Sequence, residues 1–192
     1  MAVRRLRRSF FARHSVAVAP ELLGLVLLKD GVGGPIIEAE AYHEEEPSCH
    51  AHGGRTARNQ SLFLRGGHLY VYRIHRSLCA NVSTGPPGSG QGVLVRALLP
   101  TDGRDRIARR RGGRPERIWT DGPGKVCQAL AISLDDDGQD LLSPGGVRLV
   151  DRGHRPRPDD VEVGPRVGIS RAVDLPWRFL WHPPRPLGAP RT

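Results

Sequence analysis

Cysteine is scarce in this 192-residue chain, and the sequence has no long apolar segment. Cys49, Cys79 and Cys127 are odd in number and far apart, and none of them forms a CxxC pair. This pattern excludes a disulfide framework and a four-cysteine zinc site, and it is typical of a protein in a reducing cytoplasm. No run approaches the roughly 18 apolar residues of a membrane span. We therefore expect an untargeted cytoplasmic protein with no membrane partner.

Lysine is almost missing as well, although the chain is strongly basic. Lys29 and Lys125 are the only lysines, so arginine supplies most of the 29 basic residues, which outnumber 20 acidic residues and give a net charge of +9. Arginine forks suit phosphates and base edges, which favours a polyanionic partner. A composition inherited from a GC-rich genome explains the excess equally well, although the clusters at residues 4–8 and 104–117 resemble local contact surfaces.

Several motifs of catalysis and binding are incomplete. Four potential metal ligands lie at residues 43–52: His43, Cys49, His50 and His52. They lack the second short pair that structural zinc sites combine, so we expect no metal. The run GPGKVCQALAI at 122–132 is no Walker loop, because Val126 stands where Ser or Thr is needed and the first glycine is missing. No serine has a nucleophile-elbow context, and neither lysine lies near the acidic cluster described next, which disfavours Schiff-base chemistry.

The densest set of reactive side chains lies at residues 36–58, IIEAEAYHEEEPSCHAHGGRTAR. The apolar positions 37, 39 and 41 alternate with Glu38, Glu40 and Tyr42, which predicts a strand with both glutamates and the tyrosine on one face. Such a face lines a pocket or is simply solvated, and periodicity alone favours the solvated alternative. A carboxylate, a histidine, tyrosines and an isolated arginine on a basic protein nevertheless suit hydrolysis at a nucleotide, with rings to stack on a base taken out of the duplex.

Hydrophobic periodicity and turn residues predict one domain over residues 1–192. The expected strands lie at 25–28, 36–42, 69–74, 78–82, 93–99, 147–150 and 165–170, with 75–77 as the turn of a hairpin. The expected helices lie at 20–23, at 101–111 and from Gly122 onward, the last with Val126, Ala129 and Leu130 on its apolar face. A basic arm at 1–9 and a tail at 183–192 are expected to be loose.

Nine fragments of the chain, in order, carry a specific likeness. They are LLGLVLL at 22–28, EAEAY at 38–42, a histidine with GGR at 50–55, RN at 58–59, LYVY at 69–72, CANVS at 79–83, VLVRAL at 93–98, GPGKVCQALAI at 122–132 and RVGIS at 166–170. Together they resemble the alkyladenine (3-methyladenine) DNA glycosylase family, also called methylpurine glycosylases. The resemblance spans most of the chain.

The resemblance implies a role for each matching position. Glu40 is similar to the general base that activates the attacking water, with Arg96 and the backbone carbonyl of Val167 holding that water. The flipped base would be sandwiched by Tyr42, His50 and Tyr72, and Asn81 would collide with the amino group of a normal guanine. The expected DNA contacts are His75, Tyr70, Arg55 and Arg58.

The hairpin departs from the family pattern. His75 occupies the position of the tyrosine that wedges into the minor groove, and a smaller ring fills less of the space that a flipped nucleotide leaves. The hairpin is one residue shorter between Tyr72 and Asn81, and Arg73 stands where an apolar residue is usual. These differences concern substrate range and DNA affinity more than family membership.

The resemblance and the residue pattern together predict a mixed α/β (α+β) domain, with a curved, mostly antiparallel sheet flanked by helices and a protruding β-hairpin. The expected activity is that of a monofunctional, cofactor-free glycosylase that removes 3-methyladenine, hypoxanthine or ethenoadenine from duplex DNA in base excision repair. We expect a monomer, associated with the nucleoid if the protein is bacterial. A catalytically weak damaged-DNA-binding protein and a general basic nucleic-acid-binding module remain the alternatives.

Overall fold

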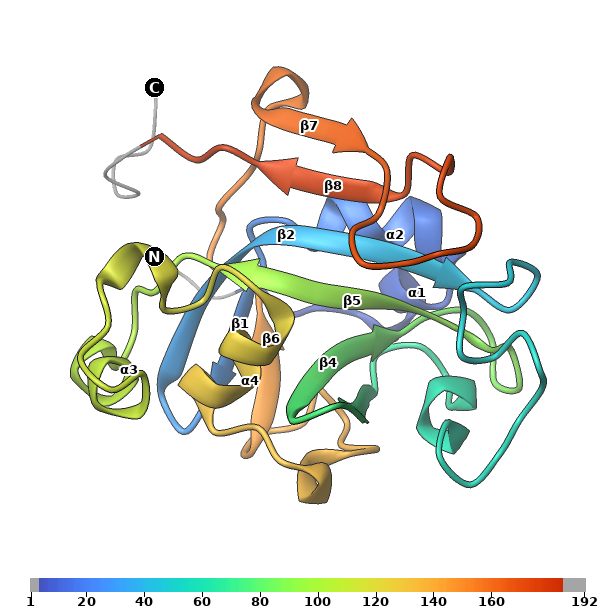
Figure 1. Ribbon diagram of the computed structural model, residues 1–192, viewed down its shortest axis with the longest axis horizontal. Coiled ribbons are helices and arrows are strands. Elements are labelled where there is room, and N and C mark those ends of the chain that lie inside the picture. The colour runs from blue at the N-terminus through green and yellow to red at the C-terminus, as the bar shows by residue number, and fades with distance from the viewer. Residues whose placement is uncertain (1–3, 185–192) are drawn as a thin grey trace.

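A curled antiparallel sheet organises the structure, and the 12-residue strand β2 runs through its middle (Figure 1). The computed structural model describes residues 4–184. Its strands are β1 (Val26–Lys29), β2 (Val32–His43), β3 (Leu69–Ile74), β4 (Ser77–Ser83), β5 (Gln91–Leu98), β6 (Val147–Val150), β7 (Val161–Gly164) and β8 (Arg178–Trp181). Its α-helices are α1 (Arg8–Phe11), α2 (Ser15–Leu22), α3 (Arg104–Arg110) and α4 (Pro123–Leu130). The predicted α+β class is confirmed.

Strand β2 has a different neighbour at each part of its length. Its first residues pair with β1, most of the strand pairs with β5, and the residues from Glu38 to Glu40 also pair with β8. The sheet order is β3-β4-β5-β2-β1-β6, and β7 joins through β8. Register shifts on either side of Glu38 mark an irregularity between β2 and β5, of the kind that bends a strand. The second half of β2 is therefore enclosed between β5 and β8.

Close backbone packing fixes the start of β2. Gly33 has a φ of 151°, and a Cβ atom there would lie 1.9 Å from the carbonyl oxygen of Leu27, so only glycine fits. The Gly33 carbonyl accepts the N–H groups of Thr101 and Asp102. These two residues are thus held against the sheet, and the helix predicted at 101–111 begins only at Arg104.

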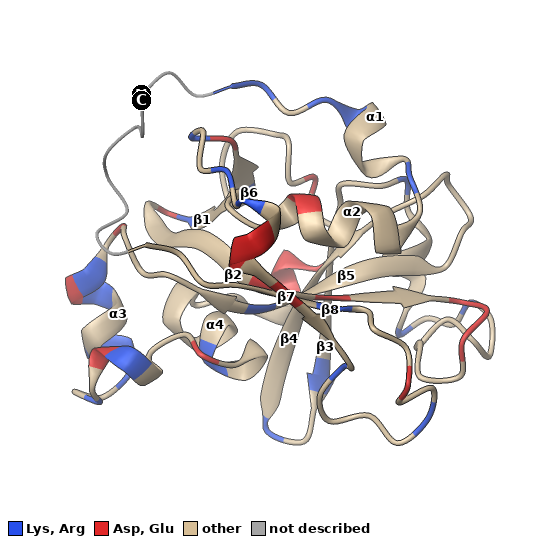
Figure 2. Cartoon of the chain, turned by 90° about the horizontal axis from the view of Figure 1, so that it is seen from above, with Lys and Arg blue, Asp and Glu red and all other residues tan. Residues whose placement is uncertain are grey.

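Helices α2 and α4 cover opposite sides of the sheet (Figures 1 and 2). Helix α4 buries Val126, Ala129 and Leu130, which confirms the predicted apolar face. Helix α2 is longer than the predicted helix at 20–23, because it starts at Ser15, after His14 accepts the N–H of Val16 with its ring nitrogen. The side chains of both helices belong to one continuous apolar core, which also includes buried residues of the sheet.

Other predicted boundaries also change. The strand predicted at 165–170 is wrong, because these residues form a loop in which Gly168 has a φ of 79°, and the nearby strand is β7. The hairpin turn is shorter than expected, since Ser77 pairs with Ile74 and belongs to β4. From Arg4 onward the arm that we expected to be loose contacts the body, through a bond from the Arg4 N–H to the carbonyl of Asp151. Residues 1–3 and 185–192 lie outside the described part.

Basic residues are concentrated in helix α3 and at the outer end of the β3–β4 hairpin (Figure 2). In the hairpin these are Arg73 and Arg76, both exposed. Acidic residues lie in β2, at Glu38 and Glu40, and in β7, at Glu162, with β8 between these two strands. Within residues 4–184, no helix is long and apolar enough to cross a membrane.

Candidate active site

The carboxylate of Glu40 is completely buried at the enclosed half of β2, with 0% of the residue exposed. Three groups donate hydrogen bonds to it. The Tyr42 hydroxyl and the Arg96 Nη1 bond to Oε2 at 2.9 and 3.2 Å, and the backbone N–H of Val167 bonds to Oε1 at 2.7 Å. A carboxylate accepts hydrogen bonds only, so all three donors match it and fix its orientation. The solvated alternative for this face of β2 is wrong.

Glu38 is a second buried carboxylate, which sequence reasoning left as a solvated residue. Its Oε1 accepts hydrogen bonds from Arg96 Nε at 3.0 Å and from Arg178 Nε at 2.6 Å. Arg96 thus lies between the two glutamates. Burial alone would lower the pKa of Arg96, but the charges of Glu40 and Glu38 outweigh burial and raise it. The period-two pattern already placed Glu38 on the face of Glu40, whereas Arg178 comes from a strand that no pattern predicted.

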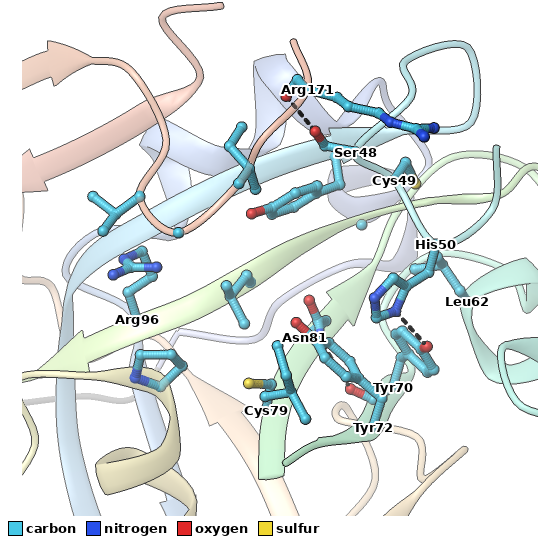
Figure 3. A pocket seen from close by; sticks show the side chains of 18 of the residues that line it. Ser48, Cys49, His50, Leu62, Tyr70, Tyr72, Cys79, Asn81, Arg96 and Arg171 are labelled. Atoms are coloured by element: carbon cyan, nitrogen blue, oxygen red, sulfur yellow. Dashed lines mark hydrogen bonds between the residues drawn. The ribbon is translucent and has the colours of Figure 1, made fainter. Parts of the chain in front are cut away.

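A cavity of about 640 Å³ opens beside this charged group (Figure 3). Its walls include most of the predicted site residues: Tyr42, His50, Tyr72, Asn81, Arg96 and Val167. They come from β2, β3, β4, β5 and the two loops that follow β2 and β7. Glu40 itself does not line the cavity, but Arg96 and Val167 do, and both touch its carboxylate. The fold therefore brings together residues separated by up to 127 positions.

Three rings form one wall of the cavity. The rings of His50 and Tyr72 meet edge to face with centroids 4.3 Å apart, and Tyr72 stacks on Tyr70 at 5.5 Å. His50 Nδ1 lies 3.0 Å from the Tyr70 hydroxyl (Figure 3). Burial of the ring lowers the pKa of His50, so the imidazole is neutral near pH 7. The wall presents uncharged aromatic surface.

Tyr42 belongs to another part of the lining. Burial, followed by the charge of Glu40 and the bond to it, raises the pKa of Tyr42 well above its usual value. The hydroxyl therefore keeps its proton and remains a donor to Glu40. The Tyr42 side chain thus lines the cavity and also donates a hydrogen bond to the Glu40 carboxylate.

Comparison of the sequence with known proteins identifies its family. A family model described as Methylpurine-DNA glycosylase (MPG) matches residues 9–184. The chain belongs to this family. A Rhodopseudomonas palustris (strain BisB18) protein is 46% identical over 178 residues, which cover 91% of this chain and 86% of the relative. A Carboxydothermus hydrogenoformans protein is 42% identical over 179 residues, which cover 91% of this chain and 93% of the relative. Both are named "Putative 3-methyladenine DNA glycosylase".

In this member of the methylpurine-DNA glycosylase family, Asn81 is 6% exposed and lines the cavity. Its Nδ2 donates to the carbonyl of Tyr70 at 3.2 Å, which fixes the amide. Tyr70, which we expected at the DNA, is only 3% exposed. Its hydroxyl meets His50, so the structure places Tyr70 in the cavity wall and not on the exposed surface.

The hairpin tip of the glycosylase carries His75 outside the cavity. His75 is exposed and has a φ of 50°, in a two-residue turn between Ile74 and Ser77. Ile74 is 45% exposed and does line the cavity. The apolar residue next to the turn therefore borders the cavity, whereas His75 is not among the residues that line it.

The expected contact residues Arg55 and Arg58 are exposed in the loop after β2. Arg58 lines a second hollow of about 830 Å³ beside the aromatic wall. Sequence reasoning gave Asn59 no role, but it holds this loop: its Nδ2 donates to the carbonyls of His50 and Gly54 at 2.9 and 3.0 Å. The RN fragment thus contains one exposed arginine and one buried structural asparagine.

The potential metal ligands of the same loop point to different partners. His52 Nδ1 lies 3.0 Å from the carbonyl of Glu44, and Cys49 Sγ contacts the carbonyl of Gly90. Burial raises the pKa of Cys49 to about 12, so this thiol is not poised to ligate. Across the described residues, no three His, Cys, Asp or Glu side chains are grouped to hold a metal ion.

Proposed function

We propose that this glycosylase-family protein hydrolyses the N-glycosidic bond of alkylated or deaminated purines that are flipped out of duplex DNA. The observation that carries the proposal is the buried Glu40 carboxylate, held by three donors directly behind an aromatic cavity. The substrate class would include 3-methyladenine, hypoxanthine and ethenoadenine. Water is the nucleophile and an abasic site is the product.

Glu40 acts as the general base in this proposal. As the bond between the purine and the sugar C1′ breaks, positive charge develops on the sugar, and a nearby carboxylate stabilises that charge. A water molecule attacks C1′ and gives one proton to Glu40, while the bonding electrons leave with the purine. Arg96 and Val167 line the cavity and touch Glu40, which supports a role for both in holding that water.

Selectivity rests on stacking and shape. An alkylated purine already carries positive charge and leaves easily, so the site needs no strong acid. The flipped base would lie between Tyr42 and the wall of His50 and Tyr72. Asn81 stands in the cavity with its amide fixed by Tyr70, where it would meet the amino group of guanine.

Duplex DNA is the proposed partner, bound by one protein molecule. Arg58 and Arg73 line the hollow beside the aromatic wall, and Arg55 is exposed in the same loop as Arg58, which supports phosphate contacts by all three. Affinity would then fall steeply with salt, because each neutralised phosphate releases counterions. The hairpin tip with His75 would follow the minor groove.

The decisive assay uses duplexes with a single hypoxanthine, ethenoadenine or 3-methyladenine. We expect free base, together with strand breaks that appear only after alkali treatment, since a monofunctional enzyme leaves the backbone intact. Specific binding of the damaged duplex without release of any of the three bases would identify a damage-binding protein instead. Breaks without alkali would mean an amine nucleophile and would contradict the proposed use of water.

A further inference from the structure

Arg166 and Glu46 form a buried ion pair directly behind the cavity wall. The Arg166 side chain is 0% exposed and that of Glu46 is 7% exposed. Nη1 and Nη2 of Arg166 bond to the two carboxylate oxygens of Glu46 at 2.6 and 3.0 Å, and Nη1 also donates to the carbonyl of Ala41 at 3.0 Å. A buried ion pair is costly to desolvate and is often no more stabilising than apolar packing. Its presence here therefore calls for a function.

The guanidinium of Arg166 stacks on Tyr42. Its Cζ lies 4.6 Å from the centroid of the Tyr42 ring and 5.2 Å from that of Trp177. Tyr42 lines the cavity whereas Arg166 does not, so the guanidinium occupies the face of the ring that is turned away from the cavity. Stacked atoms approach to roughly 3.5 Å, so a base on the front face of Tyr42 would lie about 8 Å from the Arg166 charge.

At that distance a bare guanidinium would discriminate between substrates by charge. A 3-methyladenine or 7-methylguanine nucleotide carries a positive charge on its base, whereas hypoxanthine and ethenoadenine are neutral. Across about 8 Å of protein with an effective dielectric constant near 20, repulsion of the cationic base is worth on the order of tenfold or more in affinity. Neutral bases have no net charge for the guanidinium to repel.

We propose that Glu46 is a specificity-determining residue, which cancels the charge of Arg166 behind Tyr42 and so allows the cavity to accept cationic as well as neutral purines. The bidentate pairing places the compensating charge directly on the guanidinium. Arg166 in turn supports the ring and, through bonds to the carbonyls of Ala41 and Ala172, fixes the loop that carries Val167. This inference rests on the proposed removal of purines.

The test compares release of a cationic and a neutral base by the same protein. Single-turnover rates are measured on duplexes with one 3-methyladenine or one hypoxanthine, for the unchanged chain and for Glu46→Gln. Glutamine keeps the shape of the side chain but removes the charge, so the ratio of the cationic to the neutral rate should fall about tenfold. Glu45→Gln, the same change at an exposed neighbour, should leave the ratio unaltered.

Two further variants keep the test decisive if Glu46→Gln folds poorly. Arg166→Gln leaves the negative charge of Glu46 and should raise the ratio, and the double variant Glu46→Gln/Arg166→Gln removes both charges and should restore it. A purely structural role would slow both substrates alike in every variant. Ratios that stay within twofold in the folded variants would overturn the inference alone, whereas an unchanged chain that releases neither base would overturn the proposed function and the inference with it.

Discussion

The backbone N–H of Val167 bonds to the carboxylate of Glu40 at 2.7 Å, although 127 residues separate the two in sequence. We expected the backbone carbonyl of Val167 to hold the attacking water. The structure shows in addition that the backbone N–H of Val167 contacts Glu40 directly. The segment around Val167 is anchored by Arg166, which donates to the carbonyl of Ala41 on β2. The orientation of Glu40 thus depends on a loop near the end of the chain as well as on its own strand.

Replacing Glu38 by Gln should slow base release about tenfold or more. The change removes one of the two charges that hold Arg96, so Arg96 would no longer be fixed against Glu40. Single-turnover rates on a hypoxanthine duplex measure the effect in protein shown to be folded. Glu162→Gln is the matched control, because Glu162 also pairs with Arg178 but is exposed. A normal rate in folded Glu38→Gln would mean that Glu38 only stabilises the sheet, and Glu38→Asp should recover part of the rate.

Replacing Asn81 by Ala should admit normal guanine to the cavity. The side chain is buried in the lining and fixed by its bond to the Tyr70 carbonyl, so its removal opens space where the guanine amino group would lie. We expect measurable release of guanine from undamaged duplex, with hypoxanthine release retained as the control for folding. If no guanine appears while hypoxanthine is still released, Asn81 does not exclude it.

Replacing His75 by Tyr tests the hairpin as a wedge. A larger ring should fill more of the gap left by a flipped nucleotide and tighten binding to a damaged duplex several-fold. The φ of 50° at this position makes a bulky residue cost about 1 kcal/mol of stability, which thermal unfolding would detect. Fluorescence anisotropy at one fixed salt concentration gives the affinity. Equal affinity and turnover in the two proteins would show that position 75 does not control flipping.

The acid stability of the fold should depend on Asp151. Two hydrogen bonds from Arg155, stronger than the opposing effect of burial, hold the pKa of Asp151 below its usual range. Because the pKa of Asp151 is lower in the folded state, its ionised carboxylate stabilises the fold at pH values above the unfolded-state pKa of about 3.9. This stabilisation is lost as the pH falls through the folded-state pKa. Because Arg155 is half exposed, Asp151→Asn should cost only about 1 kcal/mol at pH 7. Urea unfolding should show that this difference shrinks by pH 3, and an equal difference at both pH values would contradict the assignment.

Local patterns predicted the parts of the site that lie on regular strands. The alternation around Glu40 predicted its strand and the shared face of Glu38 and Tyr42, and both are present. Local patterns failed where proline and glycine interrupt the chain: the segment at 165–170 is a loop, not a strand. This loop is held at the site by the ion pair between Arg166 and Glu46, which are distant in sequence. Hydrophobic periodicity describes only local structure, so it could not predict this pair.

The central claim is that the carboxylate of Glu40 activates water for base removal. Glu40→Gln keeps the size of the side chain, and its single amide oxygen can still accept the hydrogen bond from Tyr42 or the one from Val167, but it cannot take the proton. The direct measurement is the single-turnover rate of hypoxanthine release from a duplex, compared among the unchanged chain, Glu40→Gln and the exposed control Glu45→Gln. The account predicts a loss of at least about 100-fold for Glu40→Gln and a normal rate for the control. Release by folded Glu40→Gln at the normal rate would contradict it.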